Sequence, residues 1–322
     1  MNFKITTRNL LVAVLLLMLC ALPLFAEKFY VQLFSKILIM GIFAMSLDLL
    51  VGYVGLVSLG HAAFFGLAGY CAALLSPQYE AGNFFVSFSA AISICILFAL
   101  LTGVLALRTK SFYFIMVTLA FAQMIFFIFH DTKIGGGGDG IYIYQKPLLA
   151  ISGITLLELE NFKTFYWFTF GWLIAIYAFL RILLQSHYGH ALGGIKVNEH
   201  RMRALGYPVF WYKLSAYVIA GSIGGIAGYF NAIQFGFVNP ENISWHTSAN
   251  VLMMVILGGM GSLHGAVFGA SVFILLQELI SNESMLGSFA SHWSLMMGFF
   301  IVAVSLFLPN GLTGLFSRGS KK

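Results

Sequence analysis

Long apolar runs separated by short polar stretches extend over almost the whole chain. An α-helix needs about 20 mainly apolar residues to cross the hydrocarbon core of a bilayer. Most of the runs approach this length, so they predict a bundle of about ten transmembrane helices in a single domain, residues 1–322. The predicted spans lie near residues 10–26, 33–54, 58–76, 84–107, 112–130, 164–184, 213–236, 248–260, 262–280 and 287–308.

Composition leads to the same fold class, an all-α integral membrane protein. Of the 322 residues 60% are hydrophobic and 9% are charged, and the mean hydropathy is +0.92. A soluble domain is only about half apolar. The cysteines Cys20, Cys71 and Cys95 lie inside apolar runs without the CxxC spacing of many zinc sites. We therefore expect packing residues there, and neither a disulfide, a metal site nor another cofactor.

The basic residues predict the orientation of the spans. If the spans alternate in direction, most lysines and arginines fall on one side, which the positive-inside rule assigns to the cytoplasm. Both termini then lie in the cytoplasm, and residues 131–163, which contain GGGGDG, form an external loop. This topology explains the formal net charge of +6, so nucleic-acid binding is not indicated. The basic residues on the cytoplasmic side are Lys4, Arg8, Arg108, Lys110, Lys196, Arg201, Arg203, Arg318, Lys321 and Lys322.

The N-terminal stretch MNFKITTRNLLVAVLLLMLCALPLFAEKF allows two interpretations. Its basic start and apolar core are typical of a signal peptide, with Ala26 before a candidate cleavage point. The alternative, which we favour, is an uncleaved first span.

Glycines inside the spans also allow two interpretations. Small residues let helices pack closely, and this is the favoured interpretation for GSIGGIAG at 221–228. Glycines can instead break a helix near mid-membrane and expose backbone groups to a water-filled path. We favour such a break for DLLVGYVGLVSLGHAAFFGLAGY at 48–70, because its polar side chains cannot be satisfied by lipid. The candidate translocation-path residues are Asp48, Gly52, Gly55, Ser58 and His61.

Asp48 has two candidate roles in this stretch. Its carboxylate either faces the path or serves as a structural partner, bonded to Ser58 or His61 or capping the helix that follows. The motif SLGHAAFFG at 58–66 is echoed by SLHGAVFGA at 262–270. This similarity is either an internal repeat of the kind transporters show or, as we favour, a coincidence of small residues.

The most charged long stretch is HYGHALGGIKVNEHRMRALGYPVFWYK at 187–213. Its pattern predicts one short helix from Ile195 to Leu205, with Ile195, Met202 and Leu205 on one side and Glu199 four residues before Arg203. A helix of about 16 Å cannot cross a bilayer, so it must lie at the cytoplasmic surface.

The end of this helix is marked by Gly206, which suits a C-terminal cap, and by Pro208, which prevents continuation. A solvated loop helix and a helix resting on lipid are the alternatives to a docking site for a cytoplasmic protein. The docking site is favoured, because only three apolar residues form the ridge.

The stretch NEHRMRALGY resembles the cytoplasmic coupling segment of ABC-importer permeases. The chain as a whole resembles the LivM-type permeases of branched-chain amino acid importers over about residues 33 to 316. The family's Ala-Ile-Arg-Glu is replaced here by Gly-Ile-Lys-Val at 194–197, and many members have Asn at the position of Asp48. The motifs that carry the resemblance are, in order, SLDLLVGYVGLVSLGHAAFFGLAGY, LRTKSFYFIMVTLAFAQ, GGGGDGI, the coupling segment (residues 187–212) with YKLSAYVIAG, VILGGMGSLHGAVFGA and LPNGL.

This resemblance implies a permease subunit in the bacterial cytoplasmic (inner) membrane that moves branched-chain or similar small amino acids into the cytoplasm. It implies three partners besides lipid: cytoplasmic ABC ATPase subunits, a second, LivH-like permease subunit and an extracytoplasmic solute-binding protein. The chain has no Gly-Lys dipeptide and hence no Walker A loop, so it is not expected to be an enzyme. The residues implied in ATPase coupling are Glu199, Met202, Arg203, Ala204, Leu205 and Gly206.

Other function classes remain as alternatives. A permease for urea or short amides shares the same motifs, and a secondary transporter or channel shares glycine-broken spans. An intramembrane hydrolase is disfavoured, because Ser262 and His264 are two residues apart and their side chains diverge on one helix. The HYGH at 187–190 is more typical of solvated loop histidines than of a metal site.

The predicted topology can be tested by labelling introduced cysteines in a protein that lacks Cys20, Cys71 and Cys95. We expect an impermeant thiol reagent to reach a cysteine at Asn198 only from the cytoplasmic side and one at Gly138 only from outside. Labelling of both positions from the same face would contradict the topology.

Overall fold

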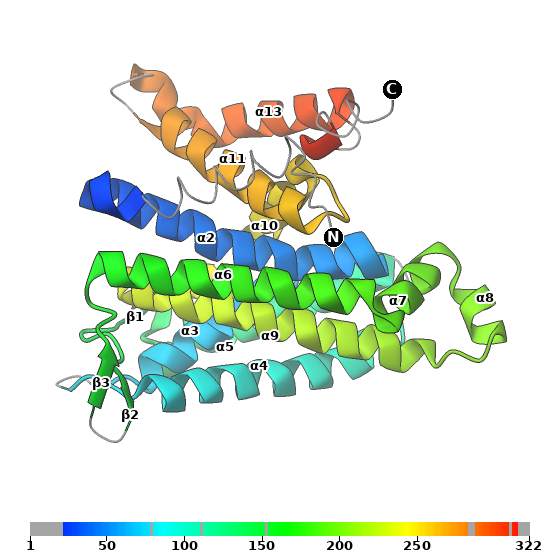
Figure 1. Ribbon diagram of the computed structural model, residues 1–322, viewed down its shortest axis with the longest axis horizontal. Coiled ribbons are helices and arrows are strands. Elements are labelled where there is room, and N and C mark those ends of the chain that lie inside the picture. The colour runs from blue at the N-terminus through cyan, green and yellow to red at the C-terminus, as the bar shows by residue number, and fades with distance from the viewer. Residues whose placement is uncertain are drawn as a thin grey trace, which may run out of the picture.

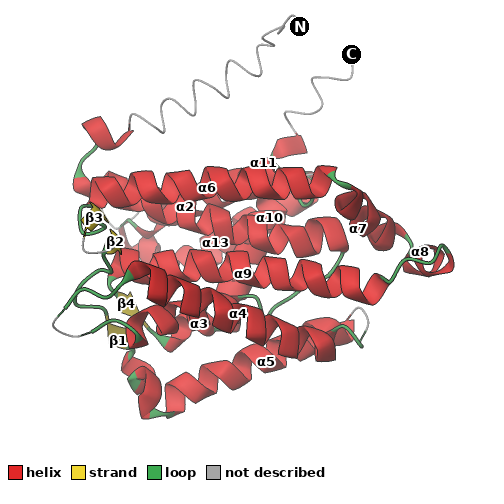
Figure 2. Ribbon diagram, turned by 60° about the horizontal axis from the view of Figure 1, so that its bottom comes forward, coloured by secondary structure: helices red, strands yellow, loops and turns green. Residues whose placement is uncertain are grey.

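Helices make up nearly all of the computed structural model, which describes residues 22–77, 80–109, 112–151, 154–282, 287–308 and 311–314 (Figures 1 and 2). Most of the predicted first span, 10–26, lies outside the described residues, as does Cys20. The α-helices are α2 (Lys28–Asp48), α3 (Ala62–Leu74), α4 (Phe84–Ala106), α5 (Phe112–Asp131), α6 (Phe162–Gln185), α7 (His187–Val197), α8 (Glu199–Ala204), α9 (Val209–Phe235), α10 (Trp245–Gly258), α11 (Leu263–Ser281) and α13 (Trp293–Phe307).

Among the described residues, six helical segments are long and apolar enough to cross a membrane by themselves. These are Lys28–Val54, Phe84–Ala106, Phe112–Asp131, Phe162–Gln185, Val209–Phe235 and Leu263–Ser281. Helices α3, α10 and α13 occupy the predicted runs 58–76, 248–260 and 287–308 but contain only 13, 14 and 15 residues. The fold class is therefore confirmed as a nearly all-α membrane protein, whereas the count of about ten spans is not.

The core lies between α2, α3 and α9, with α4 and α6 alongside them (Figure 1). In α2 and α9 most side chains are buried (89% and 78% of the most apolar window), whereas α4, α5 and α6 bury only 22–28%. Both groups are apolar throughout, so the exposed faces of α4, α5 and α6 suit contact with lipid rather than water. Helices α10, α11 and α13 pack on the opposite side of α2 from α4 (Figure 1).

Glycines let α9 approach its neighbours closely. A Cβ atom at Gly228 would overlap the backbone carbonyl of Phe65 on α3, and one at Gly225 would come within 2.6 Å of Cys95 Sγ on α4. Helix α9 continues without a break from Val209 to Phe235, so the close-packing interpretation of GSIGGIAG is confirmed. Cys71 and Cys95 are both free and buried, as expected of packing residues.

Two interruptions separate the helices near α7. Helix α2 passes into a π-helical turn, η1 (Leu49–Val54), and leaves it at Gly55, whose φ of 79° is left-handed. Helix α3 then begins at Ala62. The second interruption lies between Gly258, the last residue of α10, and Leu263, the first residue of α11. Ser262 caps α11 by accepting a hydrogen bond from Gly265 N (3.1 Å).

Short strands and 3₁₀ turns order the predicted external loop. The elements are η2 (Lys133–Gly135), η3 (Gly137–Asp139), β1 (Ile141–Tyr142), β2 (Leu149–Ile151) and β3 (Ile154–Leu157), with β4 (Phe237–Val238), η4 (Pro240–Ile243) and η5 (Gly287–His292) elsewhere. Strand β1 pairs with β4 directly after α9, and β2 pairs with β3. These strands lie at the opposite end of the bundle from α7 and α8 (Figure 1), so the coupling segment and residues 131–163 occupy opposite ends, as the alternation of spans predicts.

The close approach of α9 and α3 predicts different effects for two glycine substitutions. Gly228→Ala should lower the free energy of unfolding by about 1–3 kcal/mol, because the new methyl group meets rigid backbone. Gly171→Ala on α6 is the matched control, since no atom lies within 4 Å of its added Cβ. Thermal unfolding in detergent measures both, and equal midpoints for the two variants would contradict the close packing.

Candidate coupling segment and helix junction

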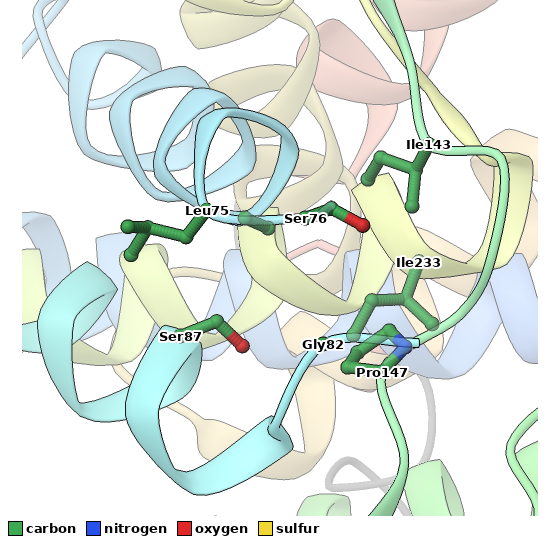
Figure 3. A pocket seen from close by; sticks show the side chains of 8 residues that line it. Leu75, Ser76, Gly82, Ser87, Ile143, Pro147 and Ile233 are labelled. Carbon is green, nitrogen blue, oxygen red and sulfur yellow. The ribbon is translucent and has the colours of Figure 1, made fainter. Parts of the chain in front are cut away.

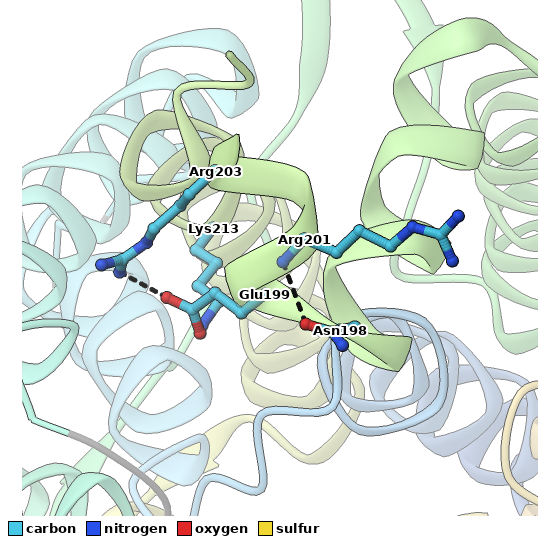
Figure 4. A network of polar contacts seen from close by, with 5 residues as sticks. All are labelled: Asn198, Glu199, Arg201, Arg203 and Lys213. Atoms are coloured by element: carbon cyan, nitrogen blue, oxygen red, sulfur yellow. Dashed lines mark hydrogen bonds and ion pairs between the residues drawn. The ribbon is translucent and has the colours of Figure 1, made fainter. Parts of the chain in front are cut away.

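The coupling segment contains two helices, α7 and α8, instead of the single helix predicted from Ile195 to Leu205. Asn198 separates them with an extended backbone (φ −155°, ψ 98°), and its Oδ1 atom accepts a hydrogen bond from Arg201 N (3.0 Å; Figure 4). The predicted helix was wrong because asparagine strongly favours the N-cap position, a signal present in the sequence.

The division of the segment also separates the predicted apolar ridge. Ile195, which belongs to α7, is buried, whereas Leu205, just beyond α8, is 66% exposed. Met202 packs back towards α7, since an added Cβ at Gly194 would lie 2.8 Å from Met202 Sδ. The three residues therefore do not form one surface.

The end of α8 follows the prediction at Gly206. Gly206 has a φ of 86°, and its N–H donates to the carbonyl of Arg203 (3.0 Å). The N–H of Tyr207 donates to the carbonyl of Met202 (3.1 Å). This pair of bonds is a Schellman motif, which glycine allows at low conformational cost.

Glu199 connects α8 with the start of α9. Its Oε1 atom accepts a hydrogen bond from Arg203 Nη2 and its Oε2 atom accepts one from Lys213 Nζ, both at 2.5 Å (Figure 4). The pairing with Arg203, four residues away, was predicted from spacing, whereas Lys213 was missed. Arg201 points away from this network (Figure 4).

Glu199 is ionised at neutral pH, which maintains its ion pairs with Arg203 and Lys213. Partial burial acts to raise the pKa of this carboxyl, but the hydrogen bonds and positive charges of Lys213 and Arg203 outweigh it, and the pKa lies below its ordinary value of 4.5. Because the pKa of Glu199 is lower in the folded protein than in the unfolded chain, its ion pairs stabilise the fold fully above the ordinary pKa. This stabilisation is lost only as the pH falls through the pKa of the folded state. The network is therefore fully charged at neutral pH.

The part of the chain that carries this network also carries exposed apolar side chains. Val197, Leu205, Tyr207 and Trp211 are 86%, 66%, 41% and 65% exposed, and we call these four residues the docking face. They flank the charged residues of α8 in the sequence, and α7 and α8 lie at the end of the bundle away from the strands (Figure 1). Ala204 and Gly206 are also exposed, so most of the predicted coupling residues are accessible to a partner.

Asp48 lies at the point where the two helix interruptions meet. It is fully buried, and its Oδ1 atom accepts a hydrogen bond from Gly261 N (2.7 Å), just before the N-cap of α11. The predicted partners Ser58 and His61 were wrong, as was capping of the following helix α3. Asp48 instead stabilises the start of α11, which lies more than 200 residues later in the chain. A negative charge is favourable at the N-terminus of a helix.

Ser58 and His61 have other partners. Ser58 Oγ accepts a hydrogen bond from Gly60 N (3.3 Å), and His61 Nε2 lies 2.8 Å from Ser46 Oγ. Ser46 Oγ donates to the carbonyl of Phe43 (2.7 Å), which assigns the donor role in the Ser46 contact to His61 Nε2. Both residues are fully buried, so they support the interruption between η1 and α3 from within.

A third element reaches the same place. Lys196 Nζ on α7 donates a hydrogen bond to the carbonyl of Gly52 in η1 (2.5 Å). An added Cβ at Gly52 would overlap both Asp48 Oδ1 and Gly261 N, so only glycine fits. We call this meeting of η1, residues 259–262 and Lys196 the helix junction. Sequence reasoning placed Asp48 and Gly52 there but missed Lys196 and Gly261, because neither is near them in the chain.

A small pocket at the strand end of the bundle, partly open to solvent and with room for little more than a water molecule, is another candidate site (Figure 3). No charged side chain lines it, so it offers no partner for the ammonium or carboxylate of an amino acid. We assign it no role in binding. Its lining residues are Ala72, Leu75, Ser76, Gly82, Ser87, Ile143, Pro147 and Ile233.

Apolar helices long enough to cross a bilayer, with a charged segment of short helices at one end, define the class of multi-pass membrane proteins. The chain belongs to the family described as branched-chain amino acid transport system / permease component, which matches residues 29–305. It is 28% identical to the high-affinity branched-chain amino acid transport system permease protein LivM of Escherichia coli (strain K12), over 95% of this chain and 75% of that protein.

Two further relatives extend the comparison. The LivM protein of Salmonella typhimurium is also 28% identical, with the same coverage of both chains. The autoinducer 2 import system permease protein LsrC of Photorhabdus laumondii is 27% identical over 75% of this chain and 70% of that protein. No solved structure matches the chain.

The position of Asp48 predicts different outcomes for its amide and its aliphatic variant. Asp48→Asn keeps an oxygen for Gly261 N, so we expect a nearly normal unfolding midpoint and nearly normal uptake per assembled permease. Asp48→Leu leaves that N–H without its acceptor and should lower the free energy of unfolding by about 1–3 kcal/mol. Loss of uptake in a well-assembled Asp48→Asn variant would instead indicate that the charge meets the substrate.

Proposed function

We propose that this chain is a permease subunit of an ATP-binding-cassette importer that moves branched-chain or similar small amino acids into the cytoplasm. The observation that carries the proposal is the similarity to LivM proteins along 95% of the chain. The relative named for autoinducer 2 import keeps a wider range of substrates open. Urea and short amides are the second candidate substrate class, because the motifs of the chain do not distinguish a permease for these compounds from one for amino acids.

The proposed complex contains cytoplasmic ATPase subunits, a second, LivH-like permease subunit and an extracytoplasmic solute-binding protein. The ATPase occupies the docking face, because exposed apolar residues beside fixed charges suit a protein groove. The solute-binding protein approaches the opposite end, where β1 and β4 order the external loop. In this proposal the chain lies in the bacterial inner membrane with both termini in the cytoplasm and about ten spans, some of them broken at glycines.

The translocation path in this proposal runs along the interruption between η1 and α3. Gly55 is exposed and Leu56 and Val57 are partly exposed, whereas Asp48 and His61 are buried behind them. The backbone of this interrupted segment therefore faces the path, and the polar side chains hold its shape. ATPase closure moves α7 and α8, and the attached spans change access to the path from outward to inward.

Reconstitution tests the function directly. Proteoliposomes containing this chain with the ATPase, second permease and solute-binding protein should accumulate labelled leucine, isoleucine or valine only with hydrolysable ATP. Excess urea or autoinducer 2 as competitor distinguishes the other substrate classes. Uptake driven by an ion gradient without the ATPase would show a secondary transporter instead.

The docking face yields a sharper prediction at Leu205. Leu205→Asp should weaken co-purification of the ATPase by at least about tenfold, because docking would bury an unpaired charge. Uptake should fall with it. Ile134→Asp is the matched control, since Ile134 is 60% exposed in the external loop. Normal ATPase co-purification with Leu205→Asp would remove the docking face from the proposal.

A further inference from the structure

The contact between Lys196 and Gly52 joins the coupling segment directly to the candidate path. Lys196 lies in the last turn of α7, one residue before its end at Val197. Its side chain passes over Gly55, where an added Cβ would lie 3.1 Å from Lys196 Cγ. Its ammonium then reaches the Gly52 carbonyl at 2.5 Å. The two residues are 144 positions apart, so the contact depends on the tertiary structure.

The ammonium group satisfies a carbonyl that the helix itself leaves open. The last carbonyls of a helix have no intrahelical donor. Here Leu50 O receives the N–H groups of both Gly55 and Leu56, and the chain turns away at Gly55. Gly52 O lies beyond this last bond, near the negative end of the helix dipole, where a cation is favourable.

Lys196 makes this contact although it is an exposed residue. An exposed lysine normally keeps its ammonium in water and retains its rotamer freedom. Lys196 gives up this freedom to bond the Gly52 carbonyl, and the bond connects α7 with η1. The carbonyl belongs to the residue that touches both Asp48 and Gly261, so the contact acts on the centre of the helix junction.

We propose that Lys196 is a positioning residue for transport, which holds the broken end of α2 to α7 so that movement of the coupling segment moves the path. This inference rests on the proposed function, since it assigns the movement to ATPase docking on α7 and α8. A purely static helix cap is the competing interpretation.

The first measurement tests, without the ATPase, whether the bond from Lys196 to Gly52 holds η1 in place. Val57, partly buried beyond η1, is replaced by cysteine in the full-length chain lacking Cys20, Cys71 and Cys95, in lipid nanodiscs. Lys196→Met should increase the rate of maleimide labelling at this position several-fold, because the turn at Gly55 loses its anchor. Lys196→Arg keeps a donor and a positive charge and should restore most of the slower rate.

Arg181→Met provides the control for this measurement. Arg181 is an exposed cation near the end of α6 that precedes α7, and its removal should leave the labelling rate unchanged. An equal labelling rate in Lys196→Met and the unsubstituted lysine protein would overturn the proposal.

The second measurement separates a moving tether from a static cap. In the reconstituted complex, Lys196→Met should bind the ATPase and hydrolyse ATP normally, yet move at least about fivefold fewer amino acids per ATP. Lys196→Arg should recover most of this ratio, and Arg181→Met should not change it. An unchanged ratio in Lys196→Met would overturn the proposal in favour of the static cap. Failure of the complex with Lys196 intact to bind the ATPase would overturn the proposed function and with it the coupling role, while the labelling would still report on the contact.

Discussion

Backbone polar groups cannot remain unpaired inside a bilayer, and this constraint governs the structure wherever a helix is interrupted. The chain leaves helical geometry at Gly55 and again between Gly258 and Leu263. The groups freed there are paired from distant parts of the chain, the Gly261 N–H by Asp48 and the Gly52 carbonyl by Lys196. Asp48 and Lys196 are therefore explained first by the interruptions and only then by transport.

The same pairing connects the charged end of the protein to its apolar interior. Polar contacts attach the coupling segment both to α9, through the ion pair of Glu199 with Lys213 and the hydrogen bond between Tyr188 and Ser215, and to η1, through the bond of Lys196 to Gly52. Helix α9 in turn packs closely against α3 through Gly228. A partner that moves α7 and α8 would thus act on both sides of the interrupted segment, as the proposed coupling to a separate ATPase requires.

Much of the fold was predictable because the bilayer and the local backbone impose their own rules. Each predicted apolar run within the described residues contains a helix. The runs could be recognised because the thickness of the hydrocarbon core sets how much apolar sequence a span needs. The cap at Gly206 and the pair of Glu199 with Arg203 followed from spacing within one or two turns. The division at Asn198 was also local and could have been predicted from its preference for the N-cap.

The candidate site was predictable only in part. The sequence by itself determined that residues 48–61 are too polar for lipid and that the coupling segment is too short and charged to span. Only the tertiary structure decided which groups pair, placing Gly261 rather than Ser58 or His61 on Asp48 and bringing Lys196 to the interrupted helix. The physical reason is that composition shows an unsatisfied polar group, whereas its partner depends on which distant backbone atoms the packing of α2, α7 and α10 brings within hydrogen-bonding distance.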